Sequence, residues 1–271
     1  MAYRAPRYSY LHAARDTGGA VYVTVSDTED PDFTKDNLFD DRAGTLFKWS
    51  ASVVDPTITV DLNSGSFPTG FDRVIVPPDH TITRLSVTED DNSGFSTPTT
   101  LLADTTAPVP GEQIDLEFDI PSTERYLRLN IIGTNTHRLP QLVFTRIETL
   151  TVGPVLADAL DGKQANAVRL LQPTGRSPTI QNGPQQRALE YLYEFALSGA
   201  DLTTMEAMIA AVGVERPFWV DPASFSTPPS TDEPVLWMKF QQMPESRYTV
   251  AVPMSGTRAK TFKLALIESL D

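Results

Sequence analysis

Cysteine is absent from the 271 residues, and histidine occurs at three isolated positions. Without cysteine the chain can form no disulfide, no thiolate nucleophile and no cysteine-type zinc site, so its stability must come from hydrophobic cores. His12, His80 and His137 are too scattered for a histidine metal motif, and the sequence has no Gly-x-Ser-x-Gly elbow or glycine-rich phosphate loop. Its many carboxylates are typical of a solvated surface. We therefore expect a protein that is not an enzyme and has no cofactor, apart from a calcium ion considered below.

Basic clusters and long apolar runs are also missing. A formal net charge of −13 argues against binding to a nucleic-acid backbone, because such proteins gather Lys and Arg to displace counterions. No apolar run approaches the roughly 20 residues that span a bilayer, and the N-terminus lacks the apolar segment of a signal peptide. We expect no membrane span, and a protein that stays in the cytoplasm until it is assembled.

The composition that is present favours a mostly β protein of two domains. Hydrophobic residues make up 40% of the chain, and 22 prolines provide many turns. A chain of this length exceeds the usual size of one domain. Glycine, proline and aspartate gather at 151–166, so we place one domain at 1–155, with an N-terminal arm at 1–20, and the other at 160–271.

The first half contains short segments in which apolar and polar residues alternate. Such alternation is the signature of a strand with one buried face. The expected strands lie at 21–25, 57–62, 71–76, 82–87, 114–118, 125–131 and 144–150. The stretch between 87 and 114, rich in Ser, Thr, Pro and Asp, is expected to form only loops.

The order of these segments resembles the discoidin, or galactose-binding-like, family of β-sandwiches. The resemblance rests on the acidic loop DNLFDDRAGT, the Trp49-Ser50 pair and the strand ITVDL that follows them, together with the RYLRL strand at 125–129. It implies a jelly-roll sandwich that contacts carbohydrate. The loops offer no clear aromatic platform beside paired carboxylates, so we expect weak sugar binding at most, and we expect Trp49 in the core.

The same resemblance implies a calcium site. In discoidin-like folds a cation often lies under the acidic loop, and the matching residues here are Asp40, Thr45 and the late Glu148, with Asp41 beside them. Oxygen donors of this kind suit Ca²⁺. The alternative is that Asp40 caps a turn of its own loop and that Glu148 faces solvent.

The second half combines strands with one helix. The aromatic run at 187–197 favours a strand over a helix. Apolar residues then recur at helical spacing from Leu202 to Val212, with Asp201 as the expected N-cap and Gly213 as the expected C-terminal residue. Further strands are expected at 216–222, 235–240, 248–252 and 259–267. The order predicts a β-sandwich or split barrel with one flanking helix.

This order of elements resembles the ring-forming domain of siphophage tail-tube and distal-tail proteins. The resemblance implies a structural virion protein at a phage tail tip, assembled in the host cytoplasm as a homo-hexameric ring that contacts tail-tube, hub and fibre proteins, and in addition host surface glycans. The aromatic residues of the half exceed what one small core would cover, so we expect them to form the ring contacts. They are Tyr191, Tyr193, Phe218, Trp219, Trp237 and Phe240. The alternative is a stand-alone, lectin-like carbohydrate-binding protein.

Overall fold

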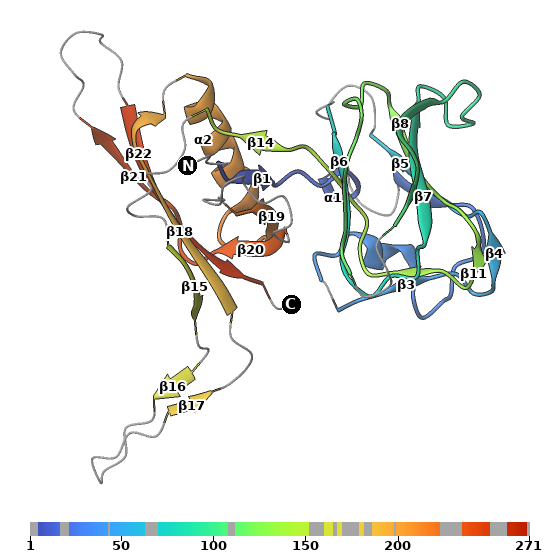
Figure 1. Cartoon of the computed structure of the whole chain (residues 1–271), viewed down its shortest axis with the longest axis horizontal. Coiled ribbons are helices and arrows are strands. Elements are labelled where there is room, and N and C mark those ends of the chain that lie inside the picture. Colours follow the sequence, from blue (N-terminus) through green and yellow to red (C-terminus); the bar gives the residue numbers. More distant parts are fainter. Residues whose placement is uncertain are drawn as a thin grey trace. The chain divides into compact units, whose positions relative to one another are not determined.

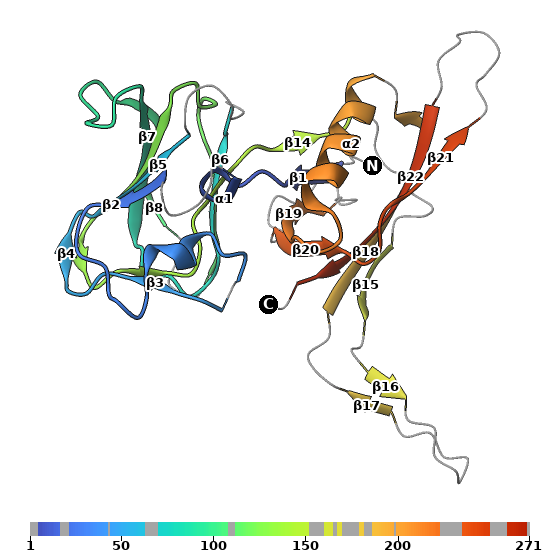
Figure 2. The same ribbon diagram turned by 180° about the vertical axis from the view of Figure 1, so that it is seen from behind.

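The computed structural model describes residues 5–16, 22–42, 44–62, 70–107, 112–151, 160–164, 167–169, 179–181, 186–197, 199–222, 235–249 and 259–269. These residues form a mostly β structure with antiparallel sheets (Figures 1 and 2). The chain divides into two units. We call residues 9–147 the sandwich unit and residues 1–8 with 148–270 the C-terminal unit.

One layer of the sandwich unit is a five-stranded antiparallel sheet, in the order β2-β5-β10-β7-β8. Its strands are β2 (Val23–Val25), β5 (Thr57–Asp61), β10 (Tyr126–Ile131), β7 (Arg84–Asp90) and β8 (Thr99–Thr106). In β5 and β10 every second residue is buried, so one face of the sheet packs on the core and the other does not. The alternation in the sequence is thereby confirmed.

The second layer is a three-stranded sheet in the order β13-β6-β9. Its strands are β13 (Val143–Thr145), β6 (Arg73–Val76) and β9 (Ile114–Glu117). Apolar residues from both sheets form one core cluster, which includes Trp49 as expected. Short elements complete the unit: α1 (Ala13–Asp16), the 3₁₀ helix η2 (Lys35–Leu38), and the pairs β3 (Phe47–Lys48) with β12 (Arg138–Leu139) and β4 (Val53–Val54) with β11 (Thr134–Asn135).

Strand β8 corrects the expectation that 87–114 forms only loops. The strand runs for eight residues and pairs with β7. Only Leu101 and Leu102 are buried in it. Threonine favours strands, and an edge strand needs few buried side chains, so a segment without regular alternation can still extend a sheet.

The C-terminal unit is built on an eight-stranded sheet that includes residues 7–9. Seven strands follow the order β14-β1-β19-β20-β22-β18-β15, and β21 pairs with β22. The strands are β14 (Glu148–Thr149), β1 (Arg7–Ser9), β19 (Phe218–Asp221), β20 (Leu236–Phe240), β22 (Ala259–Glu268), β18 (Gln186–Leu197), β15 (Leu160–Gln164) and β21 (Glu245–Thr249). The strands β16 (Ala167–Arg169) and β17 (Thr179–Gln181) form a separate pair.

The start of the chain is shared between the two units: residues 9–16 belong to the sandwich unit, where Ala13 of α1 joins the core cluster, and Arg7 and Tyr8 belong to the C-terminal unit. Tyr8 pairs with Glu148, and its hydroxyl lies 2.6 Å from that of Tyr193 in the interior of the C-terminal unit. Arg7 forms an ion pair of 2.5 Å with the buried carboxylate of Asp221. These contacts tie Arg7 and Tyr8 to the second half. The two units meet in the sequence at 147/148, and the expected boundary at 155–160 lies outside the described residues except for Leu160.

The expected helix of the second half is confirmed as α2 (Ala200–Val212), which packs against β18. Met205, Met208 and Val212 are buried in it, as its periodicity predicts. Gly213 follows with a φ of 59° and donates its N–H to Ile209 O, so the expected C-terminal glycine is also confirmed. Asp201 is not the N-cap. The helix begins at Ala200, with Gly199 at the N-cap position, and the Asp201 carboxylate accepts hydrogen bonds from the backbone N–H and hydroxyl of Thr151.

Candidate functional site

The outer face of the five-stranded sheet carries the candidate site. On this face the pairing of strands places Thr59 between Thr24 and Arg128, and Asp61 opposite Tyr126. All five side chains occupy the positions that alternate with core residues in β2, β5 and β10. The sequence folds this way because Ile58, Val60, Leu127 and Leu129 fill the core from the other face.

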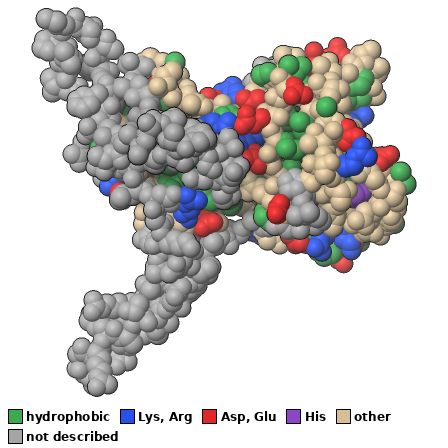
Figure 3. All heavy atoms as spheres, viewed as in Figure 1, with side chains coloured by type: hydrophobic (Ala, Val, Ile, Leu, Met, Phe, Trp, Pro, Cys, Tyr) green, Lys and Arg blue, Asp and Glu red, His purple; other side chains and the backbone are tan. Residues whose placement is uncertain are grey.

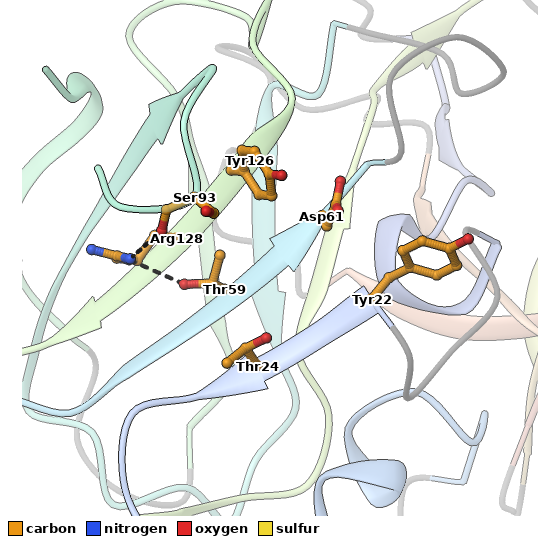
Figure 4. Close-up of a pocket in the computed structure, with 7 residues that line it drawn as sticks. All are labelled: Tyr22, Thr24, Thr59, Asp61, Ser93, Tyr126 and Arg128. Carbon is orange, nitrogen blue, oxygen red and sulfur yellow. Dashed lines mark hydrogen bonds between the residues drawn. The ribbon is translucent and has the colours of Figure 1, made fainter. Parts of the chain in front are cut away.

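A cavity of about 270 Å³ opens on this face (Figure 4). Two tyrosines, three hydroxyl side chains, one carboxylate and one guanidinium line it: Tyr22, Tyr126, Thr24, Thr59, Ser93, Asp61 and Arg128. Six of these seven residues belong to β2, β5 and β10 or directly precede β2, and Ser93 comes from the turn after β7. The rigid sheet, more than flexible loops, therefore positions the lining.

Asp61 is held by a bidentate ion pair. Arg125 donates to both of its carboxylate oxygens at 2.7 Å, and these bonds raise the pKa of the Arg125 guanidinium above its ordinary value. The same guanidinium lies over the Tyr126 ring, 4.9 Å from its centroid. The carboxylate and the tyrosine are thus fixed beside each other at the cavity.

Arg128 is fixed by different partners. Its Nε donates to Thr59 Oγ1 at 3.1 Å, and Nη2 approaches the carbonyl oxygen of Ser93 at 3.5 Å (Figure 4). Its guanidinium carbon lies 3.5 Å from the centroid of the Phe95 ring, in a close cation–π contact. Burial lowers the pKa of Arg128, and the charge of Asp90 opposes this effect.

The turn after β7 is held in place by Asp90. Its carboxylate accepts hydrogen bonds from the backbone N–H of Asn92 and of Thr97, both at 2.9 Å, and so closes the segment between them. Phe95 in this segment has a φ of 51°, which is uncommon for a bulky residue. The strained position sets the Phe95 ring on the guanidinium of Arg128.

The arrangement suits a small ligand with many hydroxyl groups. The hydroxyls, the Asp61 carboxylate and the Arg128 guanidinium offer both acceptors and donors, while the tyrosine rings offer apolar area with a polar tip. The volume lies just below the roughly 300 Å³ at which pockets for drug-sized ligands begin. No group of three or more His, Asp or Glu that could hold a metal ion occurs among the described residues.

The residues expected to hold calcium are divided between the two units. Asp40 and Thr45 lie together in the sandwich unit, where the Thr45 hydroxyl lies 2.9 and 3.0 Å from the two Asp40 carboxylate oxygens. Asp40 also accepts the backbone N–H of Arg42, which is the turn-capping arrangement of the alternative. Arg15 forms an ion pair of 3.0 Å with Asp41. Glu148 belongs to the C-terminal unit, so a site that includes it stays a prediction.

The aromatic residues expected to form ring contacts are core residues within the chain. Tyr191, Tyr193, Phe218, Trp219, Trp237 and Phe240 are all buried. Trp219 faces Trp237 across the β19–β20 pair with ring centroids 4.8 Å apart, and Phe218 lies 5.1 Å from Phe240. Side chains buried within the chain in this way offer no exposed contact surface. Assembly into a ring through other residues stays a prediction.

None of the described helices is both long and apolar enough to cross a membrane.

No protein-family model matches the sequence, and no curated protein matches it. Among solved structures, chitosan-binding module 1 of a chitosanase/glucanase from Paenibacillus sp. IK-5 is similar at 21% identity and a TM-score of 0.41, covering 51% of this chain and 98% of the module. The family 32 carbohydrate-binding module of NanJ from C. perfringens, in complex with galactose, has 14% identity and a TM-score of 0.39, covering 52% of this chain and 99% of its own.

A third similar structure is the family 32 module of AlyQ in complex with 4,5-unsaturated mannuronic acid. It has 21% identity and a TM-score of 0.37, and covers 49% of this chain and 95% of its own. None of these three structures comes from a phage tail. The expected tail-tip role, with its hexameric ring and tail partners, therefore finds no support in them.

Sequence reasoning missed the sheet face as a site. It looked for an aromatic platform in the loops, whereas Tyr126 and Arg128 lie on β10 and Thr59 and Asp61 on β5. The signal was present in the segments TITVD and YLRLN, where the non-core positions hold Tyr, Arg and Asp. Only the strand pairing shows that these positions are neighbours.

Proposed function

We propose that the sandwich unit binds carbohydrate in the cavity on the outer face of its five-stranded sheet, and that it does so without catalysis. The cavity itself carries the proposal. A sugar ring presents hydroxyls at its edge and C–H groups on its faces, and the cavity offers hydrogen-bonding groups next to two tyrosine rings.

The hydrogen-bonding groups support the proposal because they are already positioned. Arg125 holds the Asp61 carboxylate with two hydrogen bonds, and Thr59 holds Arg128 with one. Binding at such a site costs little free energy for the ordering of side chains, because they are already ordered. Arg128 also keeps N–H groups for the hydroxyls of a sugar.

The strained turn also supports a binding role for this face. Phe95 keeps an uncommon positive φ, and the carboxylate of Asp90 fixes both ends of the segment that carries it. Strain of this kind persists where the surrounding structure imposes it, and it gathers at ligand sites.

Binding is tested with the full chain on a glycan array, followed by calorimetric titration of the glycans that are retained. We expect Tyr126→Ala to weaken binding by roughly ten- to a hundredfold, because it removes one aromatic wall of the cavity. Tyr22→Ala should have an effect in the same direction. The control is Phe33→Ala, which removes an exposed aromatic ring that does not line the cavity.

Two outcomes would contradict the proposal. One is that the full chain retains no glycan of any class. The other is that a glycan binds equally well to the wild type and to both tyrosine variants, which would place the site elsewhere on the molecule.

A further inference from the structure

Several of the described arginines are matched by carboxylates, whereas Arg128 is not. Six described arginines form an ion pair with Asp: Arg7, Arg15, Arg73, Arg84, Arg125 and Arg138. Arg128 forms no salt bridge with any residue that the structure describes, although the chain has 35 acidic and 22 basic residues. A positive charge without an anionic partner is therefore placed at the cavity.

The carboxylates nearest in the sheet are engaged by other groups. Asp61 is held by both hydrogen bonds of Arg125, and Asp90 accepts the backbone N–H groups of its own turn. Asp90 acts on Arg128 only through its longer-range charge. The positive charge of Arg128 is thus available to a ligand.

The donors of Arg128 are only partly used. A guanidinium has five N–H groups. Its Nε–H bonds to Thr59, and one Nη2–H is directed at the carbonyl of Ser93. Phe95 covers one face of the guanidinium plane, so that plane is held in place while further N–H groups stay free.

Burial strengthens the case for an anion. It lowers the pKa of Arg128, which means that the cation has lost hydration without gaining a bonded carboxylate. An anionic group bound to the free N–H groups would restore that lost interaction.

We propose that the cavity selects sugars that carry a negative charge, as a uronate carboxylate or a sulfate ester, and that Arg128 binds this charge. The inference deepens the proposed function and rests on it. The planar fork of a guanidinium matches both kinds of oxyanion, and the tyrosines with Asp61 would receive the ring and its hydroxyls.

The experiment compares matched sugars on the full chain by calorimetric titration. The probes are trisaccharides of galactose, glucose and mannose, the corresponding uronates, the methyl esters of those uronates, and sulfated galactose trisaccharide. We expect at least one charged probe to bind roughly tenfold or more tightly than its neutral or esterified counterpart. Raising the salt concentration should reduce the difference. Comparing the affinities for the uronates with the affinity for the sulfated trisaccharide shows which anion the site prefers.

Three variants assign the charge preference to its residue. Arg128→Gln should remove the preference for the charged probe while leaving binding of the neutral sugar. Arg128→Lys should keep part of it, because it keeps the charge and loses the fork. Arg84→Gln is the matched control, since it removes one positive charge from the same sheet at an exposed ion pair away from the cavity.

The failures of the two proposals are distinguishable. Equal binding of charged and neutral sugars overturns the charge selection and leaves the carbohydrate site intact. A preference that persists in Arg128→Gln also overturns it. Absence of binding by every probe and every array glycan overturns the carbohydrate site and the inference together.

Discussion

The sandwich unit and the C-terminal unit use their strands in different ways. In β5 and β10 of the sandwich unit, buried and partly exposed residues alternate. In β19 of the C-terminal unit all four residues are buried, and in β20 four of five are. A strand with one exposed face can carry binding side chains without disturbing the core. In a strand buried on both faces, every side chain packs in the interior.

The surface agrees with this division of roles. Figure 3 shows acidic and basic side chains interspersed over the described surface of the sandwich unit. The free face of its five-stranded sheet also joins polar residues to one another, as where Asn130 Nδ2 donates to Ser86 and Thr88 at 3.3 and 3.2 Å. Binding residues placed on such a face can change without disturbing Leu127 and Leu129 beneath them.

The largest expected effect on stability comes from a substitution in the core of the C-terminal unit. Trp219→Ala should lower the free energy of unfolding of that unit by about 3–5 kcal/mol, because it leaves a large cavity beside Trp237. Peptide-resolved hydrogen exchange in denaturant would report each unit separately. Glycan binding by the sandwich unit should persist. Loss of protection in peptides of the sandwich unit, with that of the C-terminal unit unchanged, would contradict the division.

A buried charge makes the sandwich unit vulnerable in another way. Arg73 is 1% exposed and donates to both carboxylate oxygens of Asp115, at 2.5 and 2.6 Å. Asp115→Ala should lower the free energy of unfolding by about 3 kcal/mol, since it removes the bidentate carboxylate partner of a buried cation. Denaturant unfolding measures this cost. The exposed pair offers the control, as Asp104→Ala should change the stability by less than about 1 kcal/mol.

Acid should destabilise the sandwich unit more than the C-terminal unit, because all three histidines belong to the sandwich unit. Burial, with a contribution from the charge of Arg15, lowers the pKa of His12 to about 3, and burial lowers the pKa of His80 and His137. Between pH 6.5 and 3 the unfolded state then binds more protons than the folded state, so stability falls as the pH falls.

We expect the free energy of unfolding of the sandwich unit to fall by roughly 3 kcal/mol between pH 6.5 and 4.5, at about 1.4 kcal/mol per pH unit for one fully titrating group. The C-terminal unit should change less over the same window. Hydrogen exchange at pH values from 7 to 4.5, corrected for its intrinsic rate, gives both curves. His12→Gln should flatten the curve of the sandwich unit, and a curve that stays equally steep would show that other groups titrate.

The smallest expected effect on stability concerns the free face. Thr59→Val keeps the shape of the side chain and removes the oxygen that accepts the hydrogen bond of Arg128 Nε. The free energy of unfolding should therefore change by less than about 1 kcal/mol. Sugar affinity should nevertheless fall by roughly three- to tenfold, because Arg128 loses its fixed position. Calorimetric titration beside denaturant unfolding would separate the two. Unchanged affinity would show that Thr59 does not position the guanidinium.

By itself the sequence determined where most elements form. Alternation at 57–61 and 126–131 requires strands, since a two-residue period can bury one face only in extended chain, and the period from Leu202 to Val212 requires a helix. Strand β8 was not predicted, because an edge strand with only two buried residues shows no two-residue period, and the break between β13 and β14 was not predicted, because strands of three and two residues are too short to show one.

Only the tertiary structure decided which of these elements meet. Arg125 reaches Asp61 across 64 residues and Arg128 reaches Thr59 across 69, through the pairing of β5 with β10. Residues 7–9 join the sheet of the opposite end of the chain. A polar residue at an outward position looks the same in the sequence whether it faces solvent alone or joins a cavity, because the difference lies in its partners from distant strands.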